Sequence, residues 1–478
     1  MIREDRSLEL SPEALRGLID AAARRILAHL GSLGTQPSAD TEGGAALARS
    51  LAEPLPEAGR PAEELLDLLF DRVIPKSFNT AGPGYLAYIP GGGLPHCAVA
   101  DLIADAVNRY VGVFAAAPGL AQIEANVVRW FADLAGYPAG ARGTLTSGGS
   151  LATFSALVTA RRDRLPEDFL KGTLYASEQA HLAIEKSALL AGFPAGSVRE
   201  IETDRDFRIR VDALADAIAA DRARGRTPFF VVGNAGTTNT GAVDDLAALA
   251  DLAARERLWF HVDAAYGGFF LLTAEGRLRM AGIERSDSLV LDPHKGLFLP
   301  YGTGALLVRD GETLRRAHAL SAEYLPSMQE DPDLVDFNLL SPELSRDFRG
   351  LRVWLPLKMH GIGPFRANLE EKLALARHAA RELSRMPGIE VLAEPQLSIL
   401  AFRLRREGLD TPALDRLNRD LLERINARKR VFLTGTTLGS GFAIRICVLS
   451  FRTHRDRMDE GLEDIRASLA EATPGGTP

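Results

Sequence analysis

A lysine stands at the end of a short apolar run, in the tetrapeptide DPHK at residues 292–295. The preceding residues 288–291 are typical of a buried strand, and residues 296–300 are typical of a loop. A strand that opens into a loop in this way presents the amine at the edge of a sheet. A desolvated lysine amine can lose its proton and attack a carbonyl carbon. Lys295 is therefore a candidate nucleophile, although a solvated surface lysine would leave the same pattern.

A glycine-rich segment, TSGGS at residues 146–150, comes directly before a predicted helix at 150–162. Glycines such as Gly149 let the backbone approach a ligand closely. Free N–H groups and hydroxyls at the start of a helix, such as that of Ser150, bind anions such as phosphate. An ordinary helix N-cap would use the same residue types.

A carboxylate follows another apolar run, residues 258–262, in HVDAAYGG at residues 261–268. A flat ligand could lie over Ala265, because nothing larger than a methyl group blocks it. Asp263 could then pair with a cationic ring nitrogen of that ligand. A helix cap or a structural ion pair is the other interpretation of Asp263.

Two further polar groups follow predicted strands. His181 comes shortly after the strand at 173–176, where an imidazole could stack on a planar cofactor or serve a structural role. The turn Gly236-Thr237-Thr238 follows the strand at 229–233, and its hydroxyls could orient Asp263.

Together these groups form the set of contacts that pyridoxal 5′-phosphate requires. Its aldehyde forms a Schiff base with a lysine, its phosphate needs N–H donors, and its ring nitrogen must stay protonated. An aspartate beside that nitrogen keeps the proton in place, so that the ring can accept electrons from a carbanion at the substrate Cα.

The middle of the chain alternates strands and helices, which predicts an α/β fold with a mainly parallel sheet covered on both faces. Ligands bind such sheets beyond the carboxyl ends of the strands, where the motifs above fall. The strands are expected at 173–176, 197–201, 229–233, 258–262, 288–291 and 305–308, and the helices at 150–162, 180–190, 211–222 and 245–255.

The two ends of the chain differ from this pattern. Residues 11–30 predict an amphipathic helix that begins after Ser11, residues 31–60 a loop, and residues 61–73 a second helix. This N-terminal part lacks a core of its own and is expected to pack on something else, such as a second subunit. The C-terminal part is expected to be an α+β unit with a small antiparallel sheet, with strands at 389–392, 398–404, 431–434 and 442–448.

Composition sets the broad class of protein. The chain has 478 residues, 46% hydrophobic and 25% charged, with a formal net charge of -7 spread along the sequence. This argues against a nucleic-acid partner.

The two cysteines, Cys97 and Cys447, form neither a disulfide framework nor a zinc pattern, so no metal site is expected. The N-terminus lacks the apolar core of a signal peptide, and no apolar run reaches the ~20 residues of a membrane span. We therefore expect a cytoplasmic protein.

With these motifs in hand, the chain resembles the group II pyridoxal-phosphate decarboxylases, the relatives of aromatic-L-amino-acid decarboxylase, within fold-type I. The resemblance covers roughly residues 83–454, and TSGGS, the QAH of residues 179–181, GTT, HVDAAYGG and DPHK occur in the family's order. It implies an aspartate aminotransferase-like fold, pyridoxal 5′-phosphate as cofactor, and a homodimer clasped by its N-terminal helices with the site at the interface.

The resemblance also implies roles for individual residues. Lys295 would form the Schiff base, Asp263 would contact the pyridine nitrogen, and His181 would stack on the ring. The remaining cofactor contacts that it implies are Ala265 beneath the ring, Gly149 and Ser150 at the phosphate, Thr238 beside Asp263, and His294.

Tyr324, in the segment SAEYLP at 321–326, matches the start of the family's mobile catalytic loop. The family's loop tyrosine is thought to protonate the substrate carbon after carbon dioxide leaves, which requires a general acid. Related aldehyde synthases commonly have phenylalanine there, so Tyr324 favours plain decarboxylation.

The sequence departs from the family pattern in two places. Asp292 stands where members that act on aromatic amino acids often have asparagine. A carboxylate beside a phosphate is unfavourable unless it points away, so Asp292 is not counted among the phosphate ligands. In the substrate-pocket segment at 85–93, Ile89 and Gly91 replace the usual aromatic residue and threonine. An aromatic substrate therefore does not follow from the resemblance, and Tyr88, Ile89 and His96 are candidate pocket residues.

The sequence predicts a homodimeric enzyme that decarboxylates an L-amino acid to an amine through the Lys295 Schiff base and a quinonoid carbanion. An aldehyde-forming oxidative deaminase or an aminotransferase on the same fold is the alternative, and a cofactor-binding protein without turnover is the alternative of another class. We expect three parts: an N-terminal helical dimerisation segment at 1–80, a large cofactor-binding α/β domain at 81–350, and a small α+β domain at 351–478.

Overall fold

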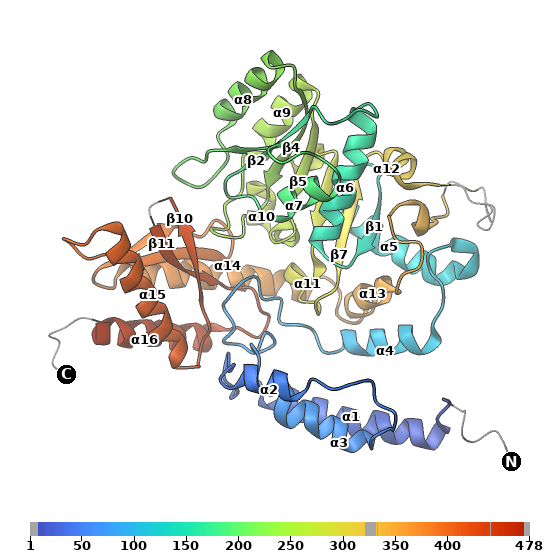
Figure 1. Ribbon diagram of the computed structural model, residues 1–478, viewed down its shortest axis with the longest axis vertical. Coiled ribbons are helices and arrows are strands. Elements are labelled where there is room, and N and C mark those ends of the chain that lie inside the picture. The colour runs from blue at the N-terminus through green and yellow to red at the C-terminus, as the bar shows by residue number, and fades with distance from the viewer. Residues whose placement is uncertain (1–7, 321–330, 332, 440, 473–478) are drawn as a thin grey trace. The chain divides into compact units, whose positions relative to one another are not determined.

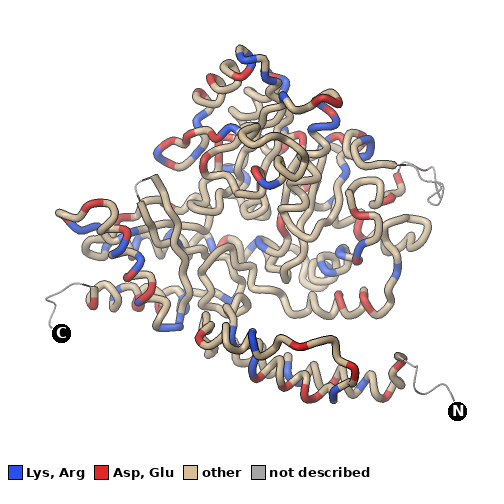
Figure 2. The backbone as a smooth tube through the Cα atoms, in the orientation of Figure 1, with Lys and Arg blue, Asp and Glu red and all other residues tan. Residues whose placement is uncertain are grey.

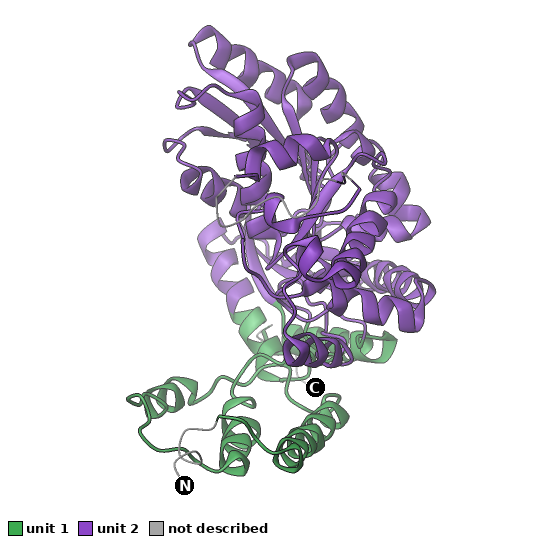
Figure 3. Ribbon diagram, turned by 90° about the vertical axis from the view of Figure 1, so that its right-hand side faces the viewer, with its two compact units in different colours: residues 1–85, 420–433, 452–478 green, residues 86–419, 434–451 purple. Residues whose placement is uncertain are grey.

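A computed structural model describes residues 8–320, 331, 333–439 and 441–472. The chain forms two compact units, each assembled from segments that are distant in sequence (Figures 1 and 3). One unit consists of residues 1–85, 420–433 and 452–478, and the other of residues 86–419 and 434–451. The three-part division drawn from the sequence stays a prediction.

The larger unit is built around a seven-stranded sheet with the strand order β1-β7-β6-β5-β4-β2-β3. Strands β2 and β4 to β7 coincide with apolar runs and are buried almost throughout, which is why these residues form the centre of a sheet covered on both faces. The strands are β1 (Arg142–Thr146), β2 (Gly172–Ser177), β3 (Val198–Ile201), β4 (Thr227–Asn234), β5 (Trp259–Asp263), β6 (Ser288–Leu291) and β7 (Gly304–Val308).

Strand direction brings the motif-bearing loops to one edge of the sheet. Strands β6, β5, β4, β2 and β3 are parallel, and β7 is antiparallel to both of its neighbours, β6 and β1. Strand β1 therefore runs in the same direction as β6. The carboxyl ends of β1, β2, β4, β5 and β6 consequently lie at the same edge, the usual place for a ligand in this type of sheet.

Helices pack against the sheet and complete its core. Helix α6 contacts β1 and β7, helix α8 contacts β3 and β4, and α9 contacts β4 and β5. The predicted α/β architecture is confirmed, although the sequence reading omitted β1. The helices of this part are α4 (Cys97–Val107), α5 (Pro118–Leu134), α6 (Gly149–Arg164), α7 (Ala183–Leu190), α8 (Val211–Ala223), α9 (Leu246–Glu256), α10 (Ala274–Arg279), α11 (Pro293–Gly296), α12 (Gly311–His318), α13 (Arg349–His360) and α14 (Gly363–Ser384).

A second, four-stranded antiparallel sheet has the order β10-β11-β9-β8. The prediction of a strand at 431–434 is wrong: β10 begins at Thr434 and pairs with β11, whereas Phe432 forms only an isolated bridge with Tyr85. The elements are β8 (Ile389–Ala393), β9 (Ile399–Leu404), α15 (Thr411–Ala427), β10 (Thr434–Leu438), β11 (Gly441–Cys447) and α16 (Arg455–Ala472).

The N-terminal helices belong to the smaller unit. Helix α1 (Pro12–Ser32) begins after Ser11, whose side chain accepts a hydrogen bond from the Ala14 N–H, as the sequence predicted. The predicted loop contains a short helix, α2 (Gly44–Ser50), and the second predicted helix is split into α3 (Ala62–Asp67) and a π-helical turn, Leu68–Val73.

The described residues carry positive and negative side chains interspersed along the chain (Figure 2). None of the helices among them is sufficiently long and apolar to span a bilayer.

Candidate active site

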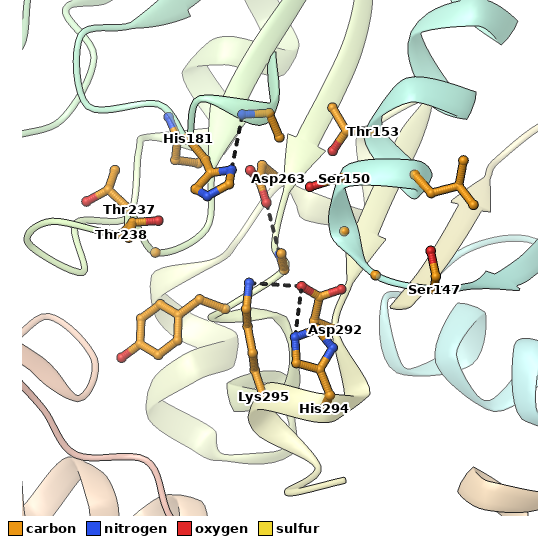
Figure 4. Close-up of a pocket in the computed structure, with 18 residues that line it drawn as sticks. Ser147, Ser150, Thr153, His181, Thr237, Thr238, Asp263, Asp292, His294 and Lys295 are labelled. Carbon is orange, nitrogen blue, oxygen red and sulfur yellow. Dashed lines mark hydrogen bonds and ion pairs between the residues drawn. The ribbon is translucent and has the colours of Figure 1, made fainter. Parts of the chain in front are cut away.

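A cavity of about 280 Å³ lies at the carboxyl edge of the seven-stranded sheet. Its walls come from the loops after β1, β2, β4, β5 and β6, so the topology collects side chains from segments more than a hundred residues apart (Figure 4). Among the residues that the sequence singled out, the cavity is lined by Gly149, Ser150, His181, Thr238, Asp263, Ala265, His294 and Lys295.

Lys295 lies on α11, a single helical turn that follows β6. Its Nζ atom is 2.9 Å from Oδ2 of Asp292, and its side chain is 20% exposed, so the amine is accessible from the cavity. The Lys295 backbone N–H also donates to the Asp292 carbonyl oxygen. The turn therefore fixes both ends of the ion pair, and the amine points into the cavity (Figure 4).

His294 is oriented by the loop that precedes β7. Its Nδ1 is 2.7 Å from the carbonyl oxygen of Thr303, so this nitrogen carries a proton and donates it. The Nε2 atom then faces Oδ2 of Asp292 at 3.8 Å. Burial lowers the pKa of His294, which favours the neutral imidazole.

Asp263 is the last residue of β5 and lies in register with Asn234 of β4 and Val290 of β6. Its Oδ1 accepts a hydrogen bond from the Ala265 N–H at 3.1 Å, which holds the carboxylate at the cavity wall. Ala265 presents only a methyl group there. The pair thus offers a carboxylate beside a flat, unobstructed floor, the arrangement that a protonated ring nitrogen requires.

His181 follows β2 and lines the cavity. Its Nδ1 accepts a hydrogen bond from the Ala183 N–H at 3.2 Å, so in the neutral ring the proton is on Nε2. The ring is exposed to the cavity and faces the region of Asp263 and Thr238 (Figure 4). An exposed, pre-oriented imidazole can stack on a planar ligand and also supply a proton.

The start of α6 forms an anion cradle. Its N-cap residue, Gly148, makes no side-chain capping hydrogen bond, so the first N–H groups of this 16-residue helix remain available to a ligand. A Cβ atom at Gly149 would lie 2.9 Å from Oδ2 of Asp292 and 3.4 Å from the Cβ of Ala265, so a side chain there would fill the cradle. Ser147, Ser150 and Thr153 add hydroxyl groups to the same wall.

Hydrogen bonds fix the turn that follows β4. The Nε of Arg445, on β11, donates to the carbonyl oxygen of Thr238 at 2.7 Å, and the Thr237 hydroxyl is 2.9 Å from that of Thr240. These contacts leave the Thr238 side chain at the cavity wall.

Sequence reasoning missed Asn234 and left Asp292 outside the site. Asn234 ends β4 and donates from Nδ2 to Asp244, a buried carboxyl whose pKa is raised to about 6 by burial. The Asp292 carboxylate does not point away from the cradle: it lines the cavity, lies against Gly149 and pairs with Lys295. Asn234 is the last residue of β4 and Asp292 directly follows β6, and this position at a strand end is the signal that could have found them.

The candidate substrate residues Tyr88, Ile89 and His96 are not among the residues that line this cavity. Tyr88 is 54% exposed and Ile89 is buried in the core. The ring of His96 packs edge-on against His360, with 4.8 Å between ring centroids. Their part in a substrate pocket stays a prediction, and Tyr324 lies outside the described residues.

These side chains fit pyridoxal 5′-phosphate. The uncapped start of α6 suits its phosphate, the methyl group of Ala265 leaves room for its ring, and the free side of the Asp263 carboxylate suits its nitrogen. Lys295 supplies the amine for its aldehyde.

Known proteins resemble this chain along most of its length. A family model described as the pyridoxal-dependent decarboxylase conserved domain matches residues 47–405. The chain is similar to an aromatic-L-amino-acid decarboxylase of Bacillus atrophaeus, with 35% identity over 469 residues and 98% of each chain covered.

Two solved structures are also similar to the chain. One is Oryza sativa TDC with PLP and tryptamine, with a TM-score of 0.92 and 26% identity over 97% of this chain and 99% of that one. The other is Catharanthus roseus tryptophan decarboxylase in complex with L-tryptophan, with a TM-score of 0.90 and 25% identity over 97% of this chain and 100% of that one.

Proposed function

The chain belongs to the family of pyridoxal-dependent decarboxylases, and from this membership we propose that its substrate is an aromatic L-amino acid. It is a lyase that uses pyridoxal 5′-phosphate to convert an amino acid into the corresponding amine and carbon dioxide. Lys295, Asp263 and the uncapped start of α6 line one cavity, and this observation supports the proposed position of the active site.

Two observations support the aromatic class. The similar proteins named above are aromatic amino-acid decarboxylases or hold tryptophan and its amine. Among the described residues that line the cavity, Lys295 is the only lysine or arginine, so the lining offers no second fixed cation to a substrate carboxylate. An acidic side chain would need such a partner to offset its desolvation.

When bound, pyridoxal 5′-phosphate would supply an electron-accepting ring for the electron pair of the broken carbon–carboxylate bond. Asp263 holds a proton on the ring nitrogen, and this proton makes the ring electron-deficient. Ala265 and His181 line the cavity, and they would hold the two faces of the ring. Gly149, Ser150 and His294 fix the phosphate end, and Thr238 supports Asp263.

Lys295 has two proposed tasks. Its amine holds the cofactor between turnovers and displaces the amine product at the end of each one. Reprotonation of the substrate Cα requires a proton donor above the ring, and we assign this task to Tyr324 or His181. The tautomer set by the Ala183 N–H places the His181 proton on Nε2, which supports a donor role for that ring.

We further propose a cytoplasmic homodimer in which the N-terminal helices contact the partner. Helix α1 exposes several large apolar side chains in this chain, among them Leu15, Ile19, Ile26 and Leu27 at 47%, 41%, 44% and 69%. Arg25 pairs with Glu63 and Asp67, which holds α1 against α3 without covering those side chains. Both cysteines are free and buried, which suits a reducing compartment. A monomeric mass in sedimentation equilibrium would contradict the dimer.

The experiment that tests the activity is incubation of the cofactor-loaded protein with each common L-amino acid, with products read by mass spectrometry. We expect tryptamine, tyramine or phenylethylamine. An amine formed only from an acidic amino acid would overturn the substrate class. An aldehyde with ammonia would indicate oxidative deamination, and a keto acid with aminated cofactor would indicate transamination.

A further inference from the structure

Asp292 places a negative charge inside the anion cradle. The residue is only 2% exposed, and its Oδ2 lies 2.9 Å from the position of a Cβ atom on Gly149, the first residue of α6. The backbone N–H of Asp292 donates to the carbonyl oxygen of Ala265 at 3.2 Å, so the main chain holds the residue in place. The side chain therefore occupies the wall against which a phosphate would bind.

The charge of this carboxylate is balanced by one contact. Oδ2 lies 2.9 Å from Nζ of Lys295, whereas Oδ1 is buried and has no hydrogen-bond partner. His294 Nε2 is 3.8 Å from Oδ2, but burial lowers the pKa of that imidazole and favours its neutral form. The other charged side chain among the described lining residues is Asp263, which has the same sign as Asp292. Lys295 is thus the counter-ion of Asp292.

Cofactor binding would change the charges around Asp292 in two ways. The amine of Lys295 must give up a proton before it can attack the aldehyde, which weakens the ion pair. The phosphate brings up to two negative charges to the start of α6, beside the unpartnered Oδ1. The negative charges of the Asp292 carboxylate and of the phosphate would repel each other strongly in a water-poor site. The N-terminus of helix α6 offsets only part of this repulsion.

We infer that Asp292 is a positioning residue that limits how tightly the phosphate is held: it is the counter-ion of Lys295 in the cofactor-free protein and a repulsive neighbour of the phosphate in the loaded protein. The inference rests on the proposed placement of the phosphate at the start of α6. It implies that cofactor retention is tuned by the charge of one side chain.

The test compares two ligands that differ only in the phosphate. Cofactor is removed from the wild-type protein and from Asp292→Asn, and each is titrated at pH 8 with pyridoxal 5′-phosphate and with pyridoxal, followed by Schiff-base absorbance. The ratio of the two dissociation constants isolates the phosphate, because any change in the reactivity of Lys295 affects both ligands. We expect Asp292→Asn to shift this ratio at least tenfold in favour of the phosphorylated ligand, an order-of-magnitude estimate from the screened repulsion of one charge.

Inorganic phosphate supplies a second readout. It should compete with the cofactor at least about tenfold more effectively in Asp292→Asn than in the wild-type protein.

The control variant is Asp263→Asn, which removes an equal charge from the same cavity at the proposed ring-nitrogen end. It should weaken both ligands and leave their ratio within about threefold of wild type, a difference below one factor of ten in affinity. Asp292→Ser removes the same charge with a smaller side chain and serves if Asp292→Asn does not fold.

An unchanged ratio in the Asp292 variants would overturn the inference. Failure of the wild-type protein to bind either ligand would instead overturn the proposed placement of the cofactor.

Discussion

Gly91 lies where the backbone of the 85–93 segment touches the lysine-bearing turn, and its replacement gives a sharp prediction. A Cβ atom at Gly91 would overlap the carbonyl oxygen of His294 and would lie 3.0 Å from its carbonyl carbon and 3.2 Å from the carbonyl oxygen of Lys295. All three are backbone atoms, so no side-chain rotation can make room. Gly91→Ala must therefore push either its own segment or α11 away.

The size of the effect follows from this overlap. Forcing one extra methyl group into a packed region costs about 1–3 kcal/mol, and contact with backbone puts Gly91→Ala towards the upper end. Because α11 carries Lys295, part of the displacement is expected to reach its amine. A misplacement of about 1 Å in a reacting group can lower turnover by roughly 100-fold. We therefore expect a loss of about 2–3 kcal/mol in unfolding free energy together with a large loss of turnover.

Two measurements separate these effects: urea denaturation followed by fluorescence, and steady-state amine production. The matched control is Gly93→Ala, where a Cβ atom would meet nothing closer than the Cα of Pro300 at 3.9 Å. Gly93 has φ +64°, so alanine there costs about 1–2 kcal/mol of backbone strain without pressing on α11. If Gly91→Ala matched the wild-type protein in both stability and turnover, the close packing of this segment on α11 would be refuted.

Three further predictions concern single side chains. Lys295→Ala should abolish the Schiff-base absorbance and the amine product, and normal turnover in that variant would refute the assignment of the lysine. Burial lowers the pKa of His261 from 6.5 to about 4, so the unfolded chain binds a proton that the folded chain does not between these values. Stability should therefore fall by about 2 kcal/mol from pH 6.5 to pH 5 through this residue. Urea denaturation midpoints at pH 6.5 and pH 5 should show a smaller loss of stability in His261→Asn than in the wild-type protein. An equal loss in both proteins would mean that other groups cause the destabilisation at low pH. Tyr324→Phe should divert product from amine towards aldehyde, and an unchanged amine yield by mass spectrometry would remove Tyr324 from the proton-donor role.

The sequence predicted the strands that carry the site because these strands are buried on both faces and read as uninterrupted apolar runs. Strand β1 was missed because Arg142–Thr146 contains an arginine and a glycine, and Leu145 is its one large apolar residue, so the segment is not an apolar run. Its pairing with β7 nevertheless makes it a strand. The strand expected at 431–434 begins instead at Thr434, because register is set by the partner strand β11.

Part of the candidate site could also be predicted from the sequence. Lys295, Asp263, His181 and the start of α6 follow strands whose carboxyl ends share one edge, so topology alone brings them together. The direction of the Asp292 side chain could not be predicted, because it depends on the single turn of α11 and on its ion pair with Lys295.

The surroundings of the 85–93 segment were equally hidden from sequence reasoning. His96 packs on His360 of α13, more than two hundred residues away in the chain. Spacing along the chain carries no information on such a contact, so Tyr88, Ile89 and His96 were assigned from motif position alone. Gly91 is explained only by the backbone of α11 that lies against it.

The role of Lys295 is tested most directly by locating the covalent attachment of the cofactor. The purified protein is loaded with pyridoxal 5′-phosphate, reduced with borohydride, digested and analysed by peptide mass spectrometry. We expect the reduced pyridoxyl group on Lys295 alone. A label on another lysine, or no label on a protein that still forms amine, would contradict the placement of the active site at the carboxyl end of β6.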